Sequence, residues 1–394
     1  MTTMNATQMS TLERSERAMM AAAVLLAPIA ASALLVLPVY VGGLIDGLRL
    51  TPPDALFIVS MDLWGMAAAL VPAYFLMRSL SWRRVAFAML LGSILCFAAP
   101  AMHVVRDGGQ AIIAIAAWRF MGGLCSGVLM AIVLATLGRL KQADRAFSLW
   151  VLVQILFKVL AIYCLSAVLT RWAVQGFFLV LAGLALVGLP LVRFLPGRAA
   201  AQRGSTRPAW SLPALSAIAG LALFYVALSA IWANFEGIGK AVGFGHEQVA
   251  IVLSLTSLAG LAGASLSTLL IGRVPRHHAL IAGIMVIAAA AFWLGRLETL
   301  TVFTFVGAAF AFAWFFNVPL LLGSVNANDC SGGLMVFANA AIACGVAGGS
   351  SLSGLILFHG DYTLLAVLGA AAFGIVLLLM LPGGFDDVTA RRRS

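Results

Sequence analysis

The sequence predicts an all-α integral membrane protein with twelve transmembrane helices in two six-helix bundles. Of its 394 residues, 63% are hydrophobic and only 10% are charged, whereas soluble domains are about 45–50% apolar and about 25% charged. The apolar residues gather in continuous runs of roughly 20, the length that crosses a bilayer as a helix. Helices are expected because lipid leaves every backbone polar group to be bonded within the protein, and no alternating barrel pattern is present.

Twelve apolar runs can be counted along the chain. They cover residues 18–45, 55–77, 85–105, 111–138, 146–170, 173–194, 212–240, 248–271, 279–296, 299–323, 332–358 and 361–382. The first run follows a polar N-terminal stretch and is longer than the core of a signal peptide. We therefore expect it to be retained as the first span.

The basic residues predict the orientation. Of the 24 lysines and arginines, 17 fall in segments on the side of the two termini, and five fall on the other side. This bias places both termini in the cytoplasm of a multi-pass protein of the cell inner membrane. Because topology accounts for the net charge of +10, we expect no nucleic-acid partner. The five cysteines lack metal-ligand spacing, so we expect no metal, cofactor or disulfide.

The two halves of the chain repeat. Residues 196–211 are rich in Gly, Pro and Arg and predict a cytoplasmic linker between a bundle of residues 1–195 and a bundle of residues 212–394. A shift of 194 residues places Gly43 on Gly237 and the pair Arg83-Arg84 on His277-His278. Near-constant offsets over several elements favour pseudo-symmetric halves in parallel.

The fourth predicted span carries Arg119, Gly123 and Gly127 inside an apolar run. With the twelve spans and the basic linker, this Arg-x-x-x-Gly-x-x-x-Gly pattern resembles the major facilitator superfamily. The resemblance implies a secondary transporter whose two bundles expose a central site alternately to each side. In proton-coupled members this arginine is associated with proton coupling, which implies a similar role for Arg119.

Two features depart from that family. The loop from Met77 to Arg84 keeps its arginines but lacks the acidic residue and the glycines of the usual pattern, which the family uses in a charge relay. The glycine–proline pattern of drug/proton antiporters is missing between Val151 and Thr170. The second departure disfavours a typical drug exporter.

Asp62, Arg119 and Glu236 are the candidate residues for proton coupling or gating, since charges inside a membrane are costly. Asp62 and Arg119 both lie roughly 10–12 Å below the outer end of their spans, so they are expected to pair. The pair is either a proton or gating switch or a static ion pair. Glu236 is spaced i, i+4 from Lys240, so it serves either proton coupling and outer gating or a local helix pair.

Lys158 lies near the middle of the fifth span, with Gln154 one turn before it on the same face. Lys158 is either an anchor for an anionic substrate group, a coupling residue, or a lysine that snorkels or pairs with a carboxylate. The remaining substrate-binding candidates are polar or aromatic residues at comparable positions in other spans: Trp118, Tyr40, Asn234, Asn317 and Asn339.

No enzyme motif or phosphate-binding loop is present in the sequence, so an enzyme is not expected. The sequence predicts a monomeric secondary active transporter in the lipid bilayer, with protons as the coupling ion and a small organic solute as substrate. An organic anion such as a carboxylate is favoured because Arg119 and Lys158 lie in the same half. The alternatives are an efflux pump for drug-like or sugar-like compounds and a membrane sensor that does not transport.

Overall fold

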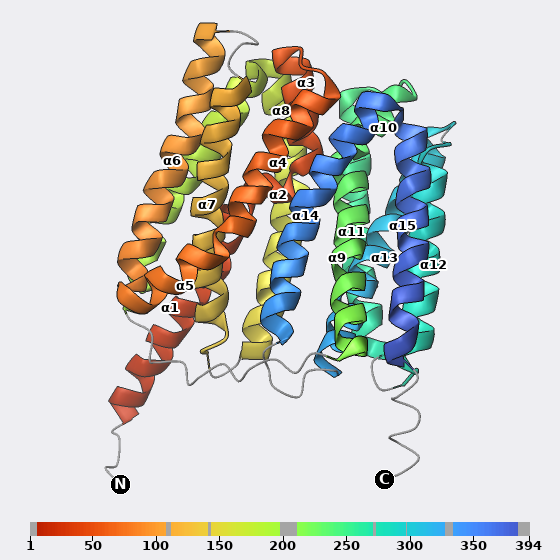
Figure 1. Cartoon of the computed structure of the whole chain (residues 1–394). Helices are drawn as coiled ribbons and strands as arrows, with labels where there is room; N and C mark the ends of the chain where they lie inside the picture. Colours follow the sequence, from red (N-terminus) through yellow and green to blue (C-terminus); the bar gives the residue numbers. More distant parts are fainter. Residues whose placement is uncertain are drawn as a thin grey trace, which may run out of the picture.

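The structure is a computed structural model that describes residues 6–107, 112–140, 143–197, 211–270, 273–296, 298–327 and 334–384. The regular elements of these residues are helices, packed side by side (Figure 1). In chain order they are α1 (Ala6–Ala30), α2 (Ser32–Leu35), α3 (Leu37–Leu48), α4 (Pro52–Ala68), α5 (Leu70–Ser79), α6 (Trp82–Asp107), α7 (Ile112–Leu137), α8 (Ala143–Gly188), the 3-10 helix η2 (Leu189–Phe194), α9 (Leu212–Ala233), α10 (Phe235–Ala241), α11 (His246–Leu270), α12 (Arg276–Leu294), α13 (Leu300–Ala327), α14 (Leu334–His359) and α15 (Tyr362–Gly384).

Several expected spans are broken helices. The first comprises α1, α2 and α3, because the backbone leaves the helical conformation at Ala31 and Val36. The second comprises α4 and α5, which meet at a bend of 41°. The seventh comprises α9 and α10, which are separated at Asn234.

The long helix α8, continued by the 3-10 helix η2, contains two expected spans, residues 146–170 and 173–194. Ala173 interrupts it with φ 50° and ψ −159°, a conformation that is costly for a residue with a Cβ. Ala173 lines a pocket together with Asp46 of α3 and His246 of α11, and α8 reaches the end of the bundle that carries α10 (Figure 1).

By length and composition, nine helices among the described residues could each cross a membrane, or ten when α4 and α5 count as one span. The long α8 supplies two of the twelve expected spans, and the broken first span supplies another. Helix α1 begins and α15 ends at the same end of the bundle (Figure 1), as an even number of crossings requires. The all-α, multi-pass fold predicted from the sequence is confirmed.

Both halves contain pairs of helices in very close contact. In the first half α4 packs against α7, and in the second half α11 packs against α13. A Cβ at Gly123 would overlap the carbonyl oxygen of Asp62, and a Cβ at Gly263 would overlap that of Phe312. These glycines let two backbones approach closely, as small residues do in membrane helices.

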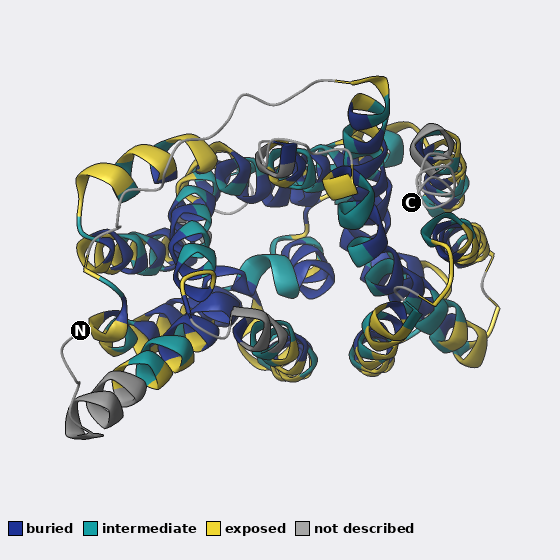
Figure 2. Ribbon diagram, turned by 90° about the horizontal axis from the view of Figure 1, so that it is seen from below, coloured by how far each residue is buried: buried dark blue, intermediate teal, exposed yellow. Residues whose placement is uncertain are grey.

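The two halves lie side by side in the view along the helices (Figure 2). They meet where α14 packs against α4 and where α11 packs against α8. The predicted linker, residues 196–211, lies almost wholly outside the described residues.

Candidate functional site

Asp62 of α4 and Arg119 of α7 form a buried ion pair. Arg119 Nη2 lies 2.7 Å from Asp62 Oδ2, and the two side chains are 0% and 4% exposed. The pairing predicted from matching depths is confirmed. Gly123 positions the pair, because its missing side chain allows α4 to bring Asp62 against α7.

The rest of the Arg119 guanidinium is held by α6. Nη1 donates to the carbonyl oxygen of Cys96 at 3.2 Å, and the guanidinium carbon lies 4.2 Å from the centroid of the Phe97 ring. Arg119 Nε has no hydrogen-bond partner among the described residues. A Cβ at Gly122 would touch the guanidinium, so this glycine leaves room for it.

Tyr40 of α3 belongs to the same buried region. Its ring stacks on Phe177 at 5.0 Å and packs edge-on against Phe178 at 5.9 Å. It is 1% exposed, and its hydroxyl has no hydrogen-bond partner among the described residues. Tyr40 therefore lies within the first half, packed against α8.

The side chain of Lys158 in α8 extends from the first half to a group of aromatic rings of the second half. Its Nζ lies 3.8 Å from the centroid of the Trp232 ring, 5.0 Å from that of Trp314 and 5.9 Å from that of Phe315. We call these three residues the aromatic cage. Lys158 is 3% exposed, and its interactions with described residues are these ring contacts.

The cage is rigid because its rings also pack on one another. Trp232 and Trp314 have centroids 5.6 Å apart, and Trp314 stacks on Phe315 at 4.7 Å. Cation–π contacts to a desolvated ammonium are worth about 2 kcal/mol or more. Lys158 is thus stabilised without a carboxylate and keeps its position between the halves.

The other predicted substrate residues are dispersed. Gln154 is partly exposed on α8, while Trp118 is 37% exposed on α7. Asn234 is buried at the α9–α10 break, where its side-chain amide donates to the carbonyl of Ala230.

Two further asparagines lie in the second half. Asn317 is fully buried on α13, donates to the carbonyl of Ala313 and packs against Gly283 of α12. Asn339 is exposed on α14. The structure therefore places neither asparagine in the aromatic cage, and their role in substrate binding stays a prediction.

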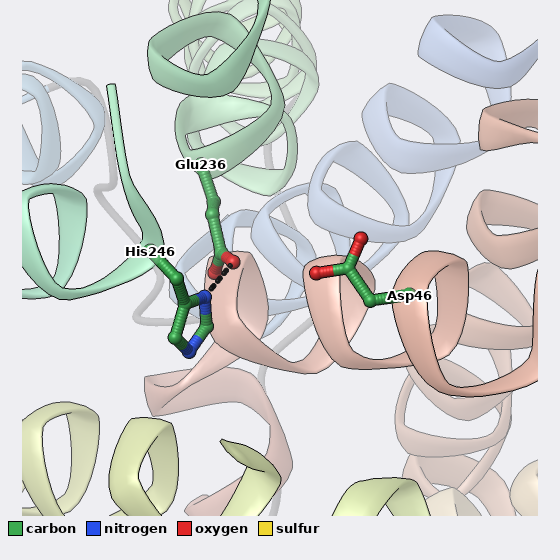
Figure 3. Close-up of side chains that lie close together, drawn as sticks. All are labelled: Asp46, Glu236 and His246. Atoms are coloured by element: carbon green, nitrogen blue, oxygen red, sulfur yellow. Dashed lines mark hydrogen bonds and ion pairs between the residues drawn. The ribbon is translucent and has the colours of Figure 1, made fainter. Parts of the chain in front are cut away.

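A second charged cluster lies at the end of the bundle that carries α10. Lys240 Nζ contacts Glu236 Oε1 at 2.8 Å and Asp46 Oδ2 at 2.5 Å. His246 Nδ1 also lies 2.8 Å from Glu236 Oε1, as Figure 3 shows. We call these four residues the α10-end cluster.

The α10-end cluster joins the two halves, since Asp46 belongs to α3 and the other three to α10 and α11. Glu236 is 1% exposed and points at Gly42 of α3, where a Cβ would overlap its carboxylate. The local Glu236–Lys240 pair predicted from the sequence is present, and it extends across the interface.

Sequence reasoning missed Asp46 and His246. The signal for Asp46 was available, because Asp46 and Lys240 are 194 residues apart, the same offset that aligns the two halves. Gly42 and Glu236, which also touch, have this offset too. Residues equivalent by the repeat therefore meet each other at this interface.

Ligand atoms of Asp46, Glu236 and His246 lie within 4.8 Å of one another, close enough to hold a metal ion. The Lys240 ammonium, however, contacts both carboxylates. It already supplies the positive charge that a metal ion would bring, so we interpret the group as a network of salt bridges.

Further contacts between the halves lie between the middle of the bundle and the α10 end. Trp64 Nε1 of α4 donates to Ser351 Oγ of α14 at 3.0 Å. Ser254 Oγ of α11 donates to the carbonyl of Val159 in α8 at 3.4 Å. With Lys158 and the α10-end cluster, these contacts join the two halves.

The arginine-containing loops at the opposite end use backbone acceptors. Arg83 Nε donates to the carbonyl of Leu195, and Arg139 lies 4.1 Å over the Trp82 ring. In the second half, Arg276 Nη1 donates to the carbonyl of Gly323 at 2.9 Å. Backbone carbonyls near helix ends carry partial negative charge, which favours the hydrogen bonds from Arg83 and Arg276.

Comparison with known proteins identifies the fold. Neither a family model nor a curated protein matches the chain. Among solved structures, a D-xylose-proton symporter matches with a TM-score of 0.70 and 14% identity, over 91% of this chain and 96% of its own. The nucleoside transporter NupG matches with 0.69 and 13%, over 94% and 98%. The human organic anion transporter TETRAN matches with 0.67 and 15%, over 93% and 99%.

Proposed function

We infer that this chain, which has the fold of major facilitator superfamily transporters, is a proton-coupled secondary active transporter for a small organic solute. The observation that carries this proposal is the buried Asp62–Arg119 pair, because ionisable pairs inside a membrane typically mark proton or ion pathways. The two bundles would rock about the interface that contains Lys158.

The membrane arrangement is part of the proposal. We propose a monomer in the cell inner membrane, and the distribution of basic residues supports the placement of both termini in the cytoplasm. The α10 end then faces outward, and the conformation described here is closed to the outside. The proposed boundaries are a bundle of residues 1–195, a linker of residues 196–211 and a bundle of residues 212–394.

Asp62 is the proposed proton acceptor. While ionised, its carboxylate holds the Arg119 guanidinium at 2.7 Å. A proton on Asp62 would remove that attraction and release the Arg119 guanidinium from the carboxyl group, since Arg119 cannot give up its own proton. Arg119 would then turn to another partner, which makes the pair a two-state element that a proton can bias.

The α10-end cluster is the proposed outer gate. Opening toward the outside must separate Asp46 from Lys240, because they belong to different halves. Glu236 is the second titratable group of the proposal, and its buried carboxylate holds both Lys240 and His246.

An organic anion is the favoured substrate. Lys158 is a buried cation at the interface without a carboxylate partner among the described residues, so an incoming carboxylate would complete its charge balance. One solved neighbour is named an organic anion transporter, while others are named for xylose and nucleosides. Export of drug-like or sugar-like compounds is the second candidate, supported by the aromatic cage.

Uptake into proteoliposomes tests the proposal. With an imposed pH gradient, the wild type should accumulate an organic anion, and Lys158→Gln should not. Glu298→Gln, an exposed substitution in the loop before α13, is the matched control. A protein that binds solutes but accumulates none of them would instead be a sensor, and the transport proposal would be wrong.

A further inference from the structure

The charge balance of the interface narrows the substrate class. Arg119 is compensated by Asp62, and Glu236 is compensated by Lys240. Lys158 has ring contacts but no ion pair among the described residues. Of the two buried cations, Arg119 and Lys158, only Lys158 is therefore available to an anion, which favours a single carboxylate over two.

The rings around Lys158 determine where that carboxylate can lie. The faces of aromatic rings are electronegative, which is why they hold an ammonium. The same faces repel an anion, so a carboxylate must approach Lys158 from the side that the rings leave open. An apolar group attached to the carboxylate can then cover the ring faces.

The cage faces become available when Lys158 moves. The ammonium lies 3.8 Å from the Trp232 ring centroid, and an arriving carboxylate would draw it away from the rings. The face of the Trp232 ring that the ammonium covered then becomes available, while Trp232 and Trp314 stay in contact with their centroids 5.6 Å apart. A planar aromatic ring can cover that face by offset stacking or edge-to-face contact.

We propose that the aromatic cage of Trp232, Trp314 and Phe315 is the ring subsite of the transporter and that its substrate is an aromatic monocarboxylate. The ring takes the place of the Lys158 ammonium against Trp232, and the carboxylate pairs with the displaced ammonium. This inference rests on the proposed function, because it assigns the substrate of the same interface.

The cage also implies how the substrate acts on the interface. Lys158 comes from the first half and the cage from the second. Its contact with the rings therefore holds the halves together. When an aromatic monocarboxylate binds, this direct contact is lost, and the ligand contacts Lys158 of the first half and the rings of the second half. The Lys158–ring contact therefore joins the halves in the empty interface, and the ligand joins them in the loaded one.

Ligand binding to the purified full chain tests this proposal without requiring transport. The probes are benzoate, 1-naphthoate and indole-3-acetate, compared with cyclohexanecarboxylate, phthalate and phenyltrimethylammonium. Binding is measured by thermal shift and by the change in tryptophan fluorescence. Benzoate should bind about 2- to 12-fold tighter than cyclohexanecarboxylate, the advantage expected from one aromatic contact.

The variants separate the two parts of the subsite. Trp232→Leu should remove the preference for benzoate over cyclohexanecarboxylate and still bind both, while Lys158→Gln should lose both. Trp232→Phe keeps a ring and should keep part of the preference, which guards against a variant that fails to fold. Trp293→Leu, on the 54% exposed Trp293 of α12, is the matched control and should behave as wild type.

Several outcomes would overturn the proposal. Equal affinity for benzoate and cyclohexanecarboxylate, or no binding of any aromatic carboxylate, would refute the ring subsite. Tighter binding of phenyltrimethylammonium than of benzoate would show that the cage takes a cation, and tighter binding of phthalate would refute the single charge. Each of these results can occur in a protein that still accumulates another solute, whereas absence of accumulation for all solutes would refute the transport proposal itself.

Discussion

Removing the carboxylate of Asp62 should destabilise the protein strongly, because it leaves the Arg119 guanidinium buried without a counter-charge. Arg119 is 0% exposed and cannot lose its proton. Its remaining partners are one carbonyl at 3.2 Å and one ring at 4.2 Å. Breaking a buried ion pair from one side costs about 3–5 kcal/mol. Asp62→Ala should lie near the upper value, about 5 kcal/mol, since it also removes the acceptor of Nη2.

Asp62→Asn should cost less, about 3 kcal/mol, because its amide oxygen can still accept from Nη2. The double variant Asp62→Asn with Arg119→Gln removes both charges and keeps groups of similar shape. It should be more stable than Asp62→Asn, since no unpaired charge remains. This order distinguishes a charge effect from a packing effect.

Unfolding of the purified protein in detergent, followed by tryptophan fluorescence, measures these differences. The exposed substitution Glu298→Gln controls for a change of net charge and should leave stability unchanged. Stability of Asp62→Ala within about 1 kcal/mol of wild type, the range of a solvent-exposed pair, would refute the reasoning. So would a double variant that is less stable than Asp62→Asn alone.

Two further predictions follow from the packing of the helices. Gly123→Leu should destabilise the protein by about 3 kcal/mol or more, because the new side chain would meet the Asp62 carbonyl. Gly183→Leu on α8 is the control and should be neutral, because Gly183 faces open space. Equal loss of folded protein in both variants would contradict the close packing of α4 and α7. Asp46→Lys should open the α10 end, and the double variant Asp46→Lys with Lys240→Asp should close it again. Thiol labelling of Leu56→Cys, in a protein whose native cysteines are replaced, measures the opening, because Leu56 packs on Gly354 of the other half. An equal labelling rate in the protein with native Asp46 and Lys240, the single variant and the double variant would show that the salt bridge does not hold this interface.

The sequence predicted the Asp62–Arg119 pair because depth within a span depends only on counting residues from its end. Both helices run in the same direction through the membrane and pack closely through Gly65 and Gly123. Equal depth therefore became direct contact. The same counting placed Lys158 near the middle of its span but could not say what surrounds it.

The surroundings of Lys158 depend on contacts between distant parts of the chain. Trp232 and Trp314 come from α9 and α13, and apolar helices carry no sequence signal that fixes which face meets which. From the sequence alone, these aromatic residues could not be distinguished from residues that only pack between helices. Their assembly around one ammonium required the three-dimensional structure.

The glycine pattern after Arg119 was predicted to allow close approach, and the structure divides that role. Gly123 and Gly127 face α4, whereas Gly122 leaves room for the guanidinium. The breaks at Ala31 and Asn234 were not predicted, whereas the break at Ala173 lies at the expected boundary between residues 146–170 and 173–194. They follow from how neighbouring helices are connected and packed, which local sequence preference does not determine.

Proton movement driven by solute is the most direct test of the central claim that Asp62 and Arg119 couple protons to transport. A pH-sensitive dye inside proteoliposomes reports it when an organic anion is added without a pH gradient. The wild type should change the internal pH, while Asp62→Asn should exchange solute across the membrane without moving protons. Solute-driven proton flux in Asp62→Asn equal to that of the wild type would contradict the account.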